Sequence, residues 1–397
     1  MTNWIPEQTV VTYDPMSPWL NSTELPFSII NASDPRNIQQ QEGYRRYYYW
    51  GAENLEKFRL WYFNGHGYLA SIICVLGIIA NGVNIIVLTR KNMMSATNMI
   101  LTAMAVADGL TMMAYLPFAI LYYWASDDQS RGTAEFFLFY IYFSVLAHSI
   151  SIWLTVTLAV FRYLFIRYPR RGVILCSIER AKLSVVLVFF ANLFVCIPNF
   201  IGHHVKHHFD PERNVSTYQA STRDSPRVYA VISRINFWVI SSLVKLLPCF
   251  LLIIASILLV RCMQEAEKRR KNLRKKSRPN CKDSDSRDRK TNRTTRMLLA
   301  VVVLFVICEL PQGIVGIFVG ILGAQFERDV YYPLGELFDI IALVNNGINF
   351  ILYCTMSKQF RETFVLLFIK PLHVGHSRRG QFILVPNHNS NTQCTDV

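Results

Sequence analysis

Seven long apolar stretches restrict what this chain can fold into. They predict helices over Gly67–Thr89, Asn98–Trp124, Thr133–Phe161, Leu183–Ile201, Ile235–Val260, Met297–Leu322 and Tyr331–Thr355. At about 1.5 Å per residue, each helix is long enough to cross the roughly 30 Å hydrocarbon core of a bilayer. The 397 residues are 52% apolar and 17% charged, which is less charge than a soluble chain of this length carries. We therefore predict an all-α membrane protein with a seven-helix bundle.

Basic residues are concentrated on one side of this bundle. The side that holds Arg90, Arg162, the 261–296 loop and the C-terminal tail carries 28 Lys and Arg, and the other side carries fewer than half as many. The positive-inside rule makes the first side cytoplasmic and puts the N-terminus outside, as in a multi-pass plasma-membrane protein. The outer side holds three Asn-x-Ser/Thr glycosylation sequons, at Asn21, Asn31 and Asn214.

The predicted organisation has three parts. Residues 1–65 form a glycosylated and mostly flexible outer segment, 66–369 form the seven-helix domain with a strongly basic inner loop at 261–296, and 370–397 form a disordered cytoplasmic tail. No signal peptide is visible, so the first helix is expected to direct insertion. The amphipathic stretch 357–364 predicts a short eighth helix along the inner membrane surface. No cysteine falls in a predicted outer loop, so no outer disulfide is expected.

Several polar residues lie inside the apolar spans, where ionisable and amide side chains indicate function. Asp108 is in the middle of the second helix, and Asn81, Ser151, Asn345 and Asn349 are at comparable depths on three other helices. Together they predict either an oxygen-rich site for a small hard cation such as Na⁺, or a water-linked polar network without an ion.

A second group of charges is predicted near the middles of the third, fifth and sixth helices. It consists of His148, Lys245 and Glu309. An unpaired charge at this depth would cost several kcal/mol, so Lys245 and Glu309 should face the bundle interior. They either pair with each other or receive the charges of a ligand. Closer to the outer face, Asp339 and Glu336 on the seventh helix add negative charge that could bind a cationic group.

The histidine-rich run His203–His208 has two interpretations. On a helix, histidines four residues apart would face one another and could hold zinc. The other histidines of the chain are isolated, however, so we favour a solvated, pH-sensitive loop and predict no metal site here.

The positions of several motifs resemble those of rhodopsin-like (class A) G-protein-coupled receptors over about residues 66–369. The residues that carry this resemblance are Asn81, Asp108, Arg162, Tyr163, Pro248, Phe305, Pro311, Asn349 and Tyr353. The chain departs from the family pattern at Phe161, where an acid is usual, at Glu309, where a tryptophan is usual, and at Phe350, where a proline is usual. The resemblance implies that Arg162, Tyr163, Phe305, Pro311 and Tyr353 take part in activation and G-protein contact.

Within that class, SATNMILTAMAVADG and HSISIWLTVTLAVFRY are similar to segments of invertebrate myosuppressin and FMRFamide-like peptide receptors. Receptors for sex peptide and myoinhibitory peptides are similar relatives and remain an alternative. The resemblance implies an outer peptide ligand with an amidated Arg-Phe end. Asp339 or Glu309 would then meet its arginine, and Tyr115, Tyr122 and Phe318 would meet its phenylalanine.

The implied partners are a heterotrimeric G protein of the Gi/o type, membrane lipid and arrestin, with no nucleic acid. No catalytic constellation appears, so an enzyme is not expected. A transporter or channel that uses Asp108 and the Lys245/Glu309 pair as a charge pathway is the competing class. The chain lacks the internal repeat typical of many transporters, which argues against that class.

Phe161 has a consequence for the resting state. Arg162 has no adjacent carboxylate, and the start of the sixth helix offers none either. Any restraint on the inactive state must come from elsewhere, with the Lys245–Glu309 pair as a candidate. We therefore expect measurable signalling without a ligand.

Overall fold

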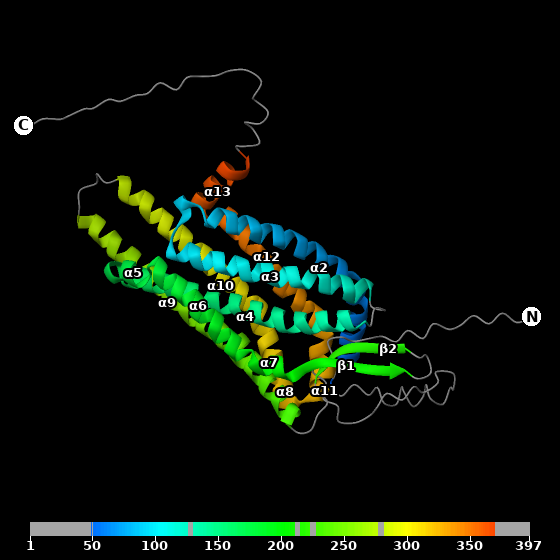
Figure 1. The fold of residues 1–397 in the computed structure, drawn as a ribbon. Helices are drawn as coiled ribbons and strands as arrows, with labels where there is room; N and C mark the ends of the chain where they lie inside the picture. Colours follow the sequence, from blue (N-terminus) through cyan, green and yellow to red (C-terminus); the bar gives the residue numbers. More distant parts are fainter. Residues whose placement is uncertain are drawn as a thin grey trace, which may run out of the picture.

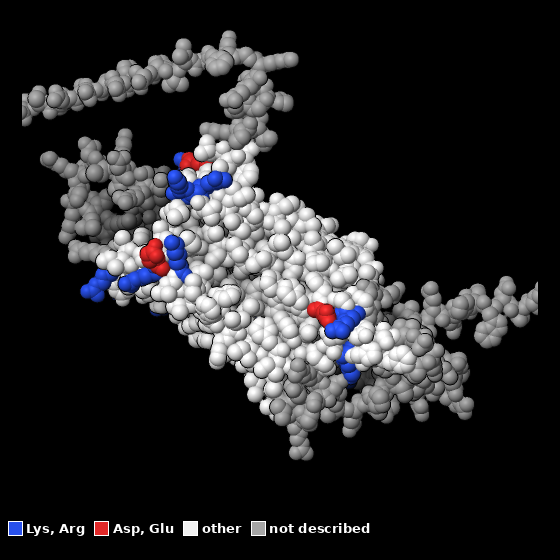
Figure 2. Space-filling model, in the orientation of Figure 1, with Lys and Arg blue, Asp and Glu red and all other residues white. Residues whose placement is uncertain are grey.

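The computed structural model describes residues 49, 51–125, 130–210, 215–222, 228–276 and 282–369. Within these ranges, seven helical segments are long and apolar enough to cross a membrane, which confirms the predicted seven-helix bundle (Figure 1). The predictions for Asn21, Asn31, Asn214 and the 370–397 tail lie outside the described residues, as does most of the 1–65 segment. Figure 2 shows charged side chains near both ends of the visible face and an uncharged band between them, as a bilayer requires.

The first four spans are largely regular helices. They are α2 (Ala52–Leu88), α3 (Ala96–Trp124), α4 (Arg131–Arg167), and α6 (Ile178–Val195) continued by α7 (Ile197–Gly202). A short helix, α5 (Pro169–Leu175), joins α4 to α6. Helix α2 begins well before the predicted Gly67. Serine caps start three of these helices: Ser95, Ser130 and Ser177 accept hydrogen bonds from backbone N–H groups of the first turn.

The last three spans contain irregular segments. The fifth runs through α8 (Val228–Val239), the π-helical segment η3 (Ile240–Leu246) and α9 (Leu247–Lys276). The sixth is α10 (Lys282–Leu322), followed by the short α11 (Ala324–Phe326). The seventh combines η4 (Glu327–Tyr331), η5 (Tyr332–Leu334) and α12 (Gly335–Met356).

Small residues allow three helices to approach closely at the centre of the bundle. A Cβ atom on Gly77 of α2 would clash with the Met112 side chain of α3 and would lie 3.6 Å from Cα of Gly347 on α12. Helix α2 therefore packs against both α3 and α12 at the depth of the predicted polar site. This packing brings polar residues that are distant in the sequence into one region.

The histidine-rich run forms a strand and not the expected loop. Strand β1 (His203–Asp210) pairs antiparallel with β2 (Val215–Thr222), with His203 opposite Thr222. The hairpin lies at the end of the bundle opposite α13 (Lys358–Phe364), the helix that follows α12 (Figure 1). Residues four apart in a strand are about 13 Å from each other, so the zinc pairing considered for a helix is not available.

Helix α13 is attached to the end of the bundle that the sequence predicts to be cytoplasmic, called here the inner end; the opposite end is called the outer end. Nδ2 of Asn92 donates to Oγ1 of Thr363 at 2.9 Å, and Nε2 of Gln359 donates to the Asn92 carbonyl at 2.6 Å. Phe360 is buried in a cluster that also contains Tyr353. These contacts hold α13 beside the end of α12, while its predicted position on the inner membrane surface stays a prediction.

Candidate functional site

The predicted polar residues near Asp108 come together around one buried carboxylate. Asp108 is 1% exposed on α3. Its Oδ1 accepts a hydrogen bond from Oγ of Ser151 at 2.5 Å, and its Oδ2 accepts one from Nδ2 of Asn349 at 3.1 Å. Asn81 reaches the same region, because its Nδ2 donates to the Asn346 carbonyl at 3.1 Å. Helices α2, α3, α4 and α12 are thus joined by polar contacts at one depth.

A water-sized cavity opens beside this carboxylate. Its polar lining consists of Asp108, His148, Ser151, Thr155, Asn345, Asn346 and Asn349. Oδ1 of Asn81 is buried without a hydrogen-bond partner among the described residues. A buried polar group of this kind usually has an ordered water or an ion as its partner. The oxygen-rich lining is compatible with either of the two interpretations drawn from the sequence.

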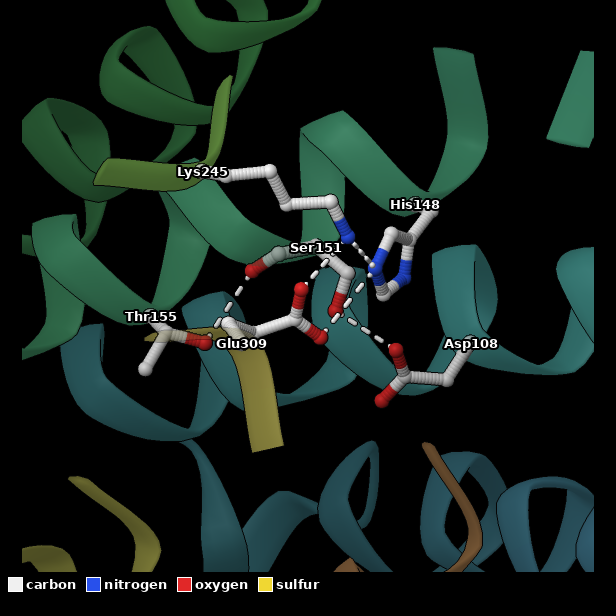
Figure 3. Close-up of polar contacts among 6 residues, drawn as sticks. All are labelled: Asp108, His148, Ser151, Thr155, Lys245 and Glu309. Atoms are coloured by element: carbon white, nitrogen blue, oxygen red, sulfur yellow. Dashed lines mark hydrogen bonds and ion pairs between the residues drawn. The ribbon is translucent and has the colours of Figure 1, made fainter. Parts of the chain in front are cut away.

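The three mid-membrane charges also meet. Nζ of Lys245 lies 2.5 Å from Oε2 of Glu309 and 3.0 Å from Nε2 of His148, which is itself 3.2 Å from Oε1 of Glu309 (Figure 3). Glu309 is 1% exposed. Lys245 and Glu309 therefore pair directly, and we call Lys245, His148 and Glu309 the ion triad. Figure 3 shows the triad next to the Asp108–Ser151 contact.

Nearer the outer face, acidic and aromatic side chains lie together. The Asp339 carboxylate of α12 is within electrostatic range of the hydroxyls of Tyr62, Tyr115, Tyr123 and Tyr140, on three neighbouring helices. It also interacts electrostatically with Glu336 and Lys245. Among the described residues, none forms a salt bridge with Asp339. The position combines negative charge with aromatic rings, a pairing that suits a cationic group.

The aromatic part of this region includes more residues than the sequence pattern predicts. Tyr115 and Tyr122 are buried in one apolar cluster of α2, α3 and α12. Tyr115 also bonds Nε2 of His66 through its hydroxyl, at 2.9 Å. Phe118 stacks on Tyr140, with ring centroids 4.1 Å apart.

His66, Tyr62, Tyr123 and Tyr140 were missed, although aromatic residues three or four apart on each helix gave a usable signal. Phe318 is placed differently. It is 47% exposed, and its ring contacts Phe326 at the outer end of α10.

At the inner end of α4, Arg162 lacks an acidic partner, as expected from Phe161 beside it in the sequence. Among the described residues no carboxylate pairs with it, and its Nε is buried without a hydrogen-bond partner. Phe161 packs into an apolar cluster of α3, α4, α6 and α12. The Cys176 thiol donates to the Phe161 carbonyl at 3.3 Å. Burial raises the pKa of Cys176 despite the charges of Arg162 and Arg180, which keeps the thiol a donor.

The other predicted activation residues have contrasting environments. Phe305 is buried between α4, α9 and α10, and Tyr353 is buried in the inner cluster near Phe360. Pro311 interrupts the hydrogen-bond ladder of α10. Tyr163 is partly buried at the inner end of α4.

Tyr142 connects the hairpin of β1 and β2 to the bundle through hydrogen bonds. Its hydroxyl lies 3.1 Å from the Phe200 carbonyl and 3.0 Å from the His203 carbonyl. The His203 ring is buried, and its Nδ1 lies 3.0 Å from the Asn199 carbonyl. All cysteines among the described residues are free. Hydrogen bonds therefore fasten the hairpin to α4 and α7.

The chain belongs to a family of G-protein-coupled receptors. Residues 68–370 match the family model described as Serpentine type 7TM GPCR chemoreceptor Srw. The resemblance to rhodopsin-like receptors is therefore confirmed, and the chain is a multi-pass membrane receptor and not an enzyme. The transporter or channel alternative has no support from this match.

Three similar proteins are also named as receptors. The chain is 30% identical to G-protein coupled receptor dmsr-1 of Caenorhabditis elegans over 77% of its own length and 68% of that protein. It is 28% identical to the Sex peptide receptor of Drosophila melanogaster, with 84% and 78% covered. It is 24% identical to the FMRFamide receptor of the same species, with 77% and 54% covered.

Proposed function

We propose that this chain is a plasma-membrane receptor, N-terminus outside, for a peptide with an amidated Arg-Phe end, and that it signals through a Gi/o-type G protein. Two relatives are named as receptors for FMRFamide and sex peptide, which supports a peptide ligand. The observation that carries the proposal is the Asp339 carboxylate, which interacts electrostatically with tyrosines on neighbouring helices and has no salt bridge to any described residue. A guanidinium group would be attracted by both the carboxylate and the rings.

Asp339 is a better partner for the ligand's cation than Glu309. The Glu309 carboxylate is already contacted by Lys245 and His148 and is almost fully buried. A ligand cation at Glu309 would have to displace Lys245 or approach its like charge. At Asp339 the ligand cation would displace no salt-bridge partner among the described residues, although the Lys245 charge is also felt there. Tyr115 and Tyr122 line the same region and remain candidates for contact with the ligand's phenylalanine, and Glu336 remains a second negative group.

The proposed mechanism is a population shift. Peptide bound at the outer end favours a state in which the inner half of α10 swings outward at Pro311. The opened inner cleft admits the G protein, and Arg162 contributes to its floor. Basic residues of the segment 261–296, most of which extends α9 and α10, would contact the G protein or anionic lipid. Such a contact is worth about 1 kcal/mol for each Lys or Arg near the surface. Arrestin binding and glycosylation at Asn21, Asn31 and Asn214 stay predictions.

The test is a screen of amidated peptides in cells that express the full chain, with G-protein activation as the readout. Peptides that end in Arg-Phe-amide should activate the receptor, and pertussis toxin should abolish the response if the G protein is of the Gi/o type. Free-acid versions of the same peptides serve as controls. A receptor at the cell surface that stays silent across the library would contradict the proposal.

A second candidate ligand class follows from the relative named Sex peptide receptor. Sex-peptide-type or myoinhibitory-type peptides belong in the same screen. Activation by these peptides alone would replace the Arg-Phe-amide assignment and keep the receptor class.

We also propose a sodium site at Asp108. Asp108 and Ser151 would supply oxygen ligands, with the amide oxygens of Asn345 and Asn349 nearby, and a hard cation suits such a set. Agonist affinity measured between low and physiological NaCl should fall for the wild type and stay level for Asp108→Asn. Substitution of the sodium by N-methylglucamine at equal ionic strength is the control. An unchanged wild-type affinity would favour a polar network without an ion.

A further inference from the structure

The ion triad joins three spans at one point. His148 is on α4, Lys245 is on the π-helical segment η3, and Glu309 is on α10. Lys245 is the centre of the arrangement, because its ammonium donates to the Glu309 carboxylate and to Nε2 of His148 (Figure 3).

Local backbone structure brings Lys245 to this point. Residues Ile240–Leu246 form a π-helix, whose wider turn changes the direction in which the side chains project. On the facing helix, Gly313 leaves room for this segment. A Cβ atom there would lie 2.8 Å from the Leu246 side chain and 3.2 Å from Cβ of Lys245. A larger residue at 313 would separate α10 from η3 and weaken the triad.

The triad lies beside the place where α10 can bend. Glu309 is two residues before Pro311, which cannot donate a backbone hydrogen bond to the preceding turn. A contact at Glu309 therefore restrains the inner half of α10 close to its pivot. The buried Glu309 carboxylate strongly opposes separation from Lys245, because an unpaired charge in this environment is very unfavourable.

No comparable restraint is found at the inner end of α4 among the residues that the structure describes. Arg162 has no ion-pair partner there, and its neighbour Phe161 packs into an apolar cluster. The ion triad is thus the buried charge contact between α10 and α4 that could hold the two helices together at rest.

We propose that Lys245, His148 and Glu309 form a resting-state lock, which ties α10 to α4 and to η3, and that signalling requires the Lys245–Glu309 pair to open. The lock explains how a chain without an acid beside Arg162 can restrain its inactive state. The connection of the lock to signalling rests on the G-protein coupling proposed above. The restraint that the lock places on α10 is independent of that coupling.

Paired neutralisation is the direct test. Lys245→Met combined with Glu309→Gln removes the lock without leaving an unpaired charge, so this variant should fold. At matched surface expression, its ligand-independent G-protein activation should rise about five-fold or more. The reversed pair, Lys245→Glu with Glu309→Lys, should return it to near the wild-type level. Wild-type basal activity in the paired neutral variant, or no recovery in the reversed pair, would overturn the proposal.

The exposed pair of Lys182 and Glu179 on α6 provides a matched control. Their charges are 3.8 Å apart and largely in solvent. Lys182→Met with Glu179→Gln should leave basal signalling unchanged. An increase as large as that of the triad variant would show that loss of any Lys–Glu pair has this effect, and it would overturn the lock.

A second readout separates the lock from the proposed function. Hydrogen exchange of the purified full chain in lipid nanodiscs should be about ten-fold faster in α10 around residues 302–311 for the paired neutral variant, and unchanged in α3. This result would support the lock even if no peptide or G protein were found. Unchanged exchange in α10 would overturn it. Failure of the proposed function would instead appear as a wild-type receptor that no peptide activates.

The role of His148 can be measured by two substitutions. His148→Gln keeps an acceptor near the Nε2 position, and His148→Leu removes it. We expect His148→Leu to raise basal signalling about three-fold and His148→Gln to stay close to wild type. Equal effects of the two substitutions would show that the hydrogen bond of His148 does not contribute to the lock.

Discussion

At the scale of single residues, two departures from the receptor pattern, Phe161 and Glu309, both change where the bundle has an ionic contact. Phe161 cannot pair with Arg162, and it instead packs with Leu158 and Ala181 in the inner apolar cluster. Glu309 stands where the family has an aromatic ring, and it is stabilised by Lys245 and His148. The loss of an ionic contact at the end of α4 is thus accompanied by an ionic contact deeper in the bundle.

Phe161→Asp should lower ligand-independent signalling, because it supplies the carboxylate that Arg162 lacks. We expect a decrease of about two- to five-fold in basal G-protein activation at equal surface expression, equivalent to up to about 1 kcal/mol. Phe161→Leu keeps an apolar side chain and serves as the control for packing. A wild-type receptor that is silent without peptide would contradict the expectation of basal activity.

At the scale of elements, the outer hairpin shows how secondary structure is fixed here without a disulfide. Strands β1 and β2 pair over eight residues each, and the hairpin is attached to α4 and α7 through Tyr142 and His203. Each contact is a hydrogen bond to a backbone carbonyl, so the attachment is local and reversible. The hairpin should therefore respond to small changes at either side chain.

Tyr142→Phe should loosen the hairpin. The substitution removes a hydroxyl that bonds two partly buried carbonyls, which costs about 1 to 2 kcal/mol. Backbone amides of β1 and β2 should then exchange hydrogen about five- to thirty-fold faster. Tyr68→Phe, at an exposed position on α2, should have no effect. Equal exchange in Tyr142→Phe and the wild type would show that other contacts hold the hairpin.

Attachment of the hairpin should also weaken in acid. Burial lowers the pKa of His203, as does the neighbouring His204, while its hydrogen bond to the Asn199 backbone acts in the opposite direction. The detached form would keep the ordinary pKa of about 6.5 and take up a proton first. Neutral His203 therefore stabilises the attachment fully above about pH 6.5. This stabilisation is lost as the pH falls through the lowered pKa of His203.

Hydrogen exchange of the hairpin at pH values between 7.5 and 5, corrected for the intrinsic pH dependence of exchange, tests this expectation. Protection should decrease toward pH 5 in the wild type, and the decrease should be absent in His203→Asn. His207→Asn, on the same strand and exposed, is the control. A decrease that survives His203→Asn would assign the effect to another group.

At the scale of the whole molecule, hydrophobicity and charge in the sequence predicted the architecture well. Seven apolar windows define the spans because a bilayer requires continuous apolar length. Asp108, Ser151 and Asn349 could be grouped by depth, since polar side chains inside a membrane have to meet one another. The same argument indicated pairing as one of two possibilities for Lys245 and Glu309.

The hairpin, the π-helical turn and the attachment by Tyr142 depend on tertiary contacts, which the periodicity of the sequence does not show. The run His203–His208 has no apolar alternation, and its strand is created by pairing with β2. The π-helical turn at Ile240–Leu246 depends on close packing against glycines of α10. The attachment by Tyr142 depends on the path of the hairpin. Tertiary contacts determine each of these features, so sequence pattern alone could not predict them.

Binding of the cationic side chain of an activating peptide by Asp339 can be measured directly. A double-mutant cycle tests it: wild type and Asp339→Asn are each titrated with an Arg-Phe-amide peptide and with the same peptide carrying citrulline in place of arginine. Glu53→Gln, an exposed substitution on α2, is the matched control. We expect Asp339→Asn to lower potency about 10- to 100-fold for the arginine peptide, and by less than about three-fold for the citrulline peptide. An equal loss for both peptides, or no loss for either, would contradict it.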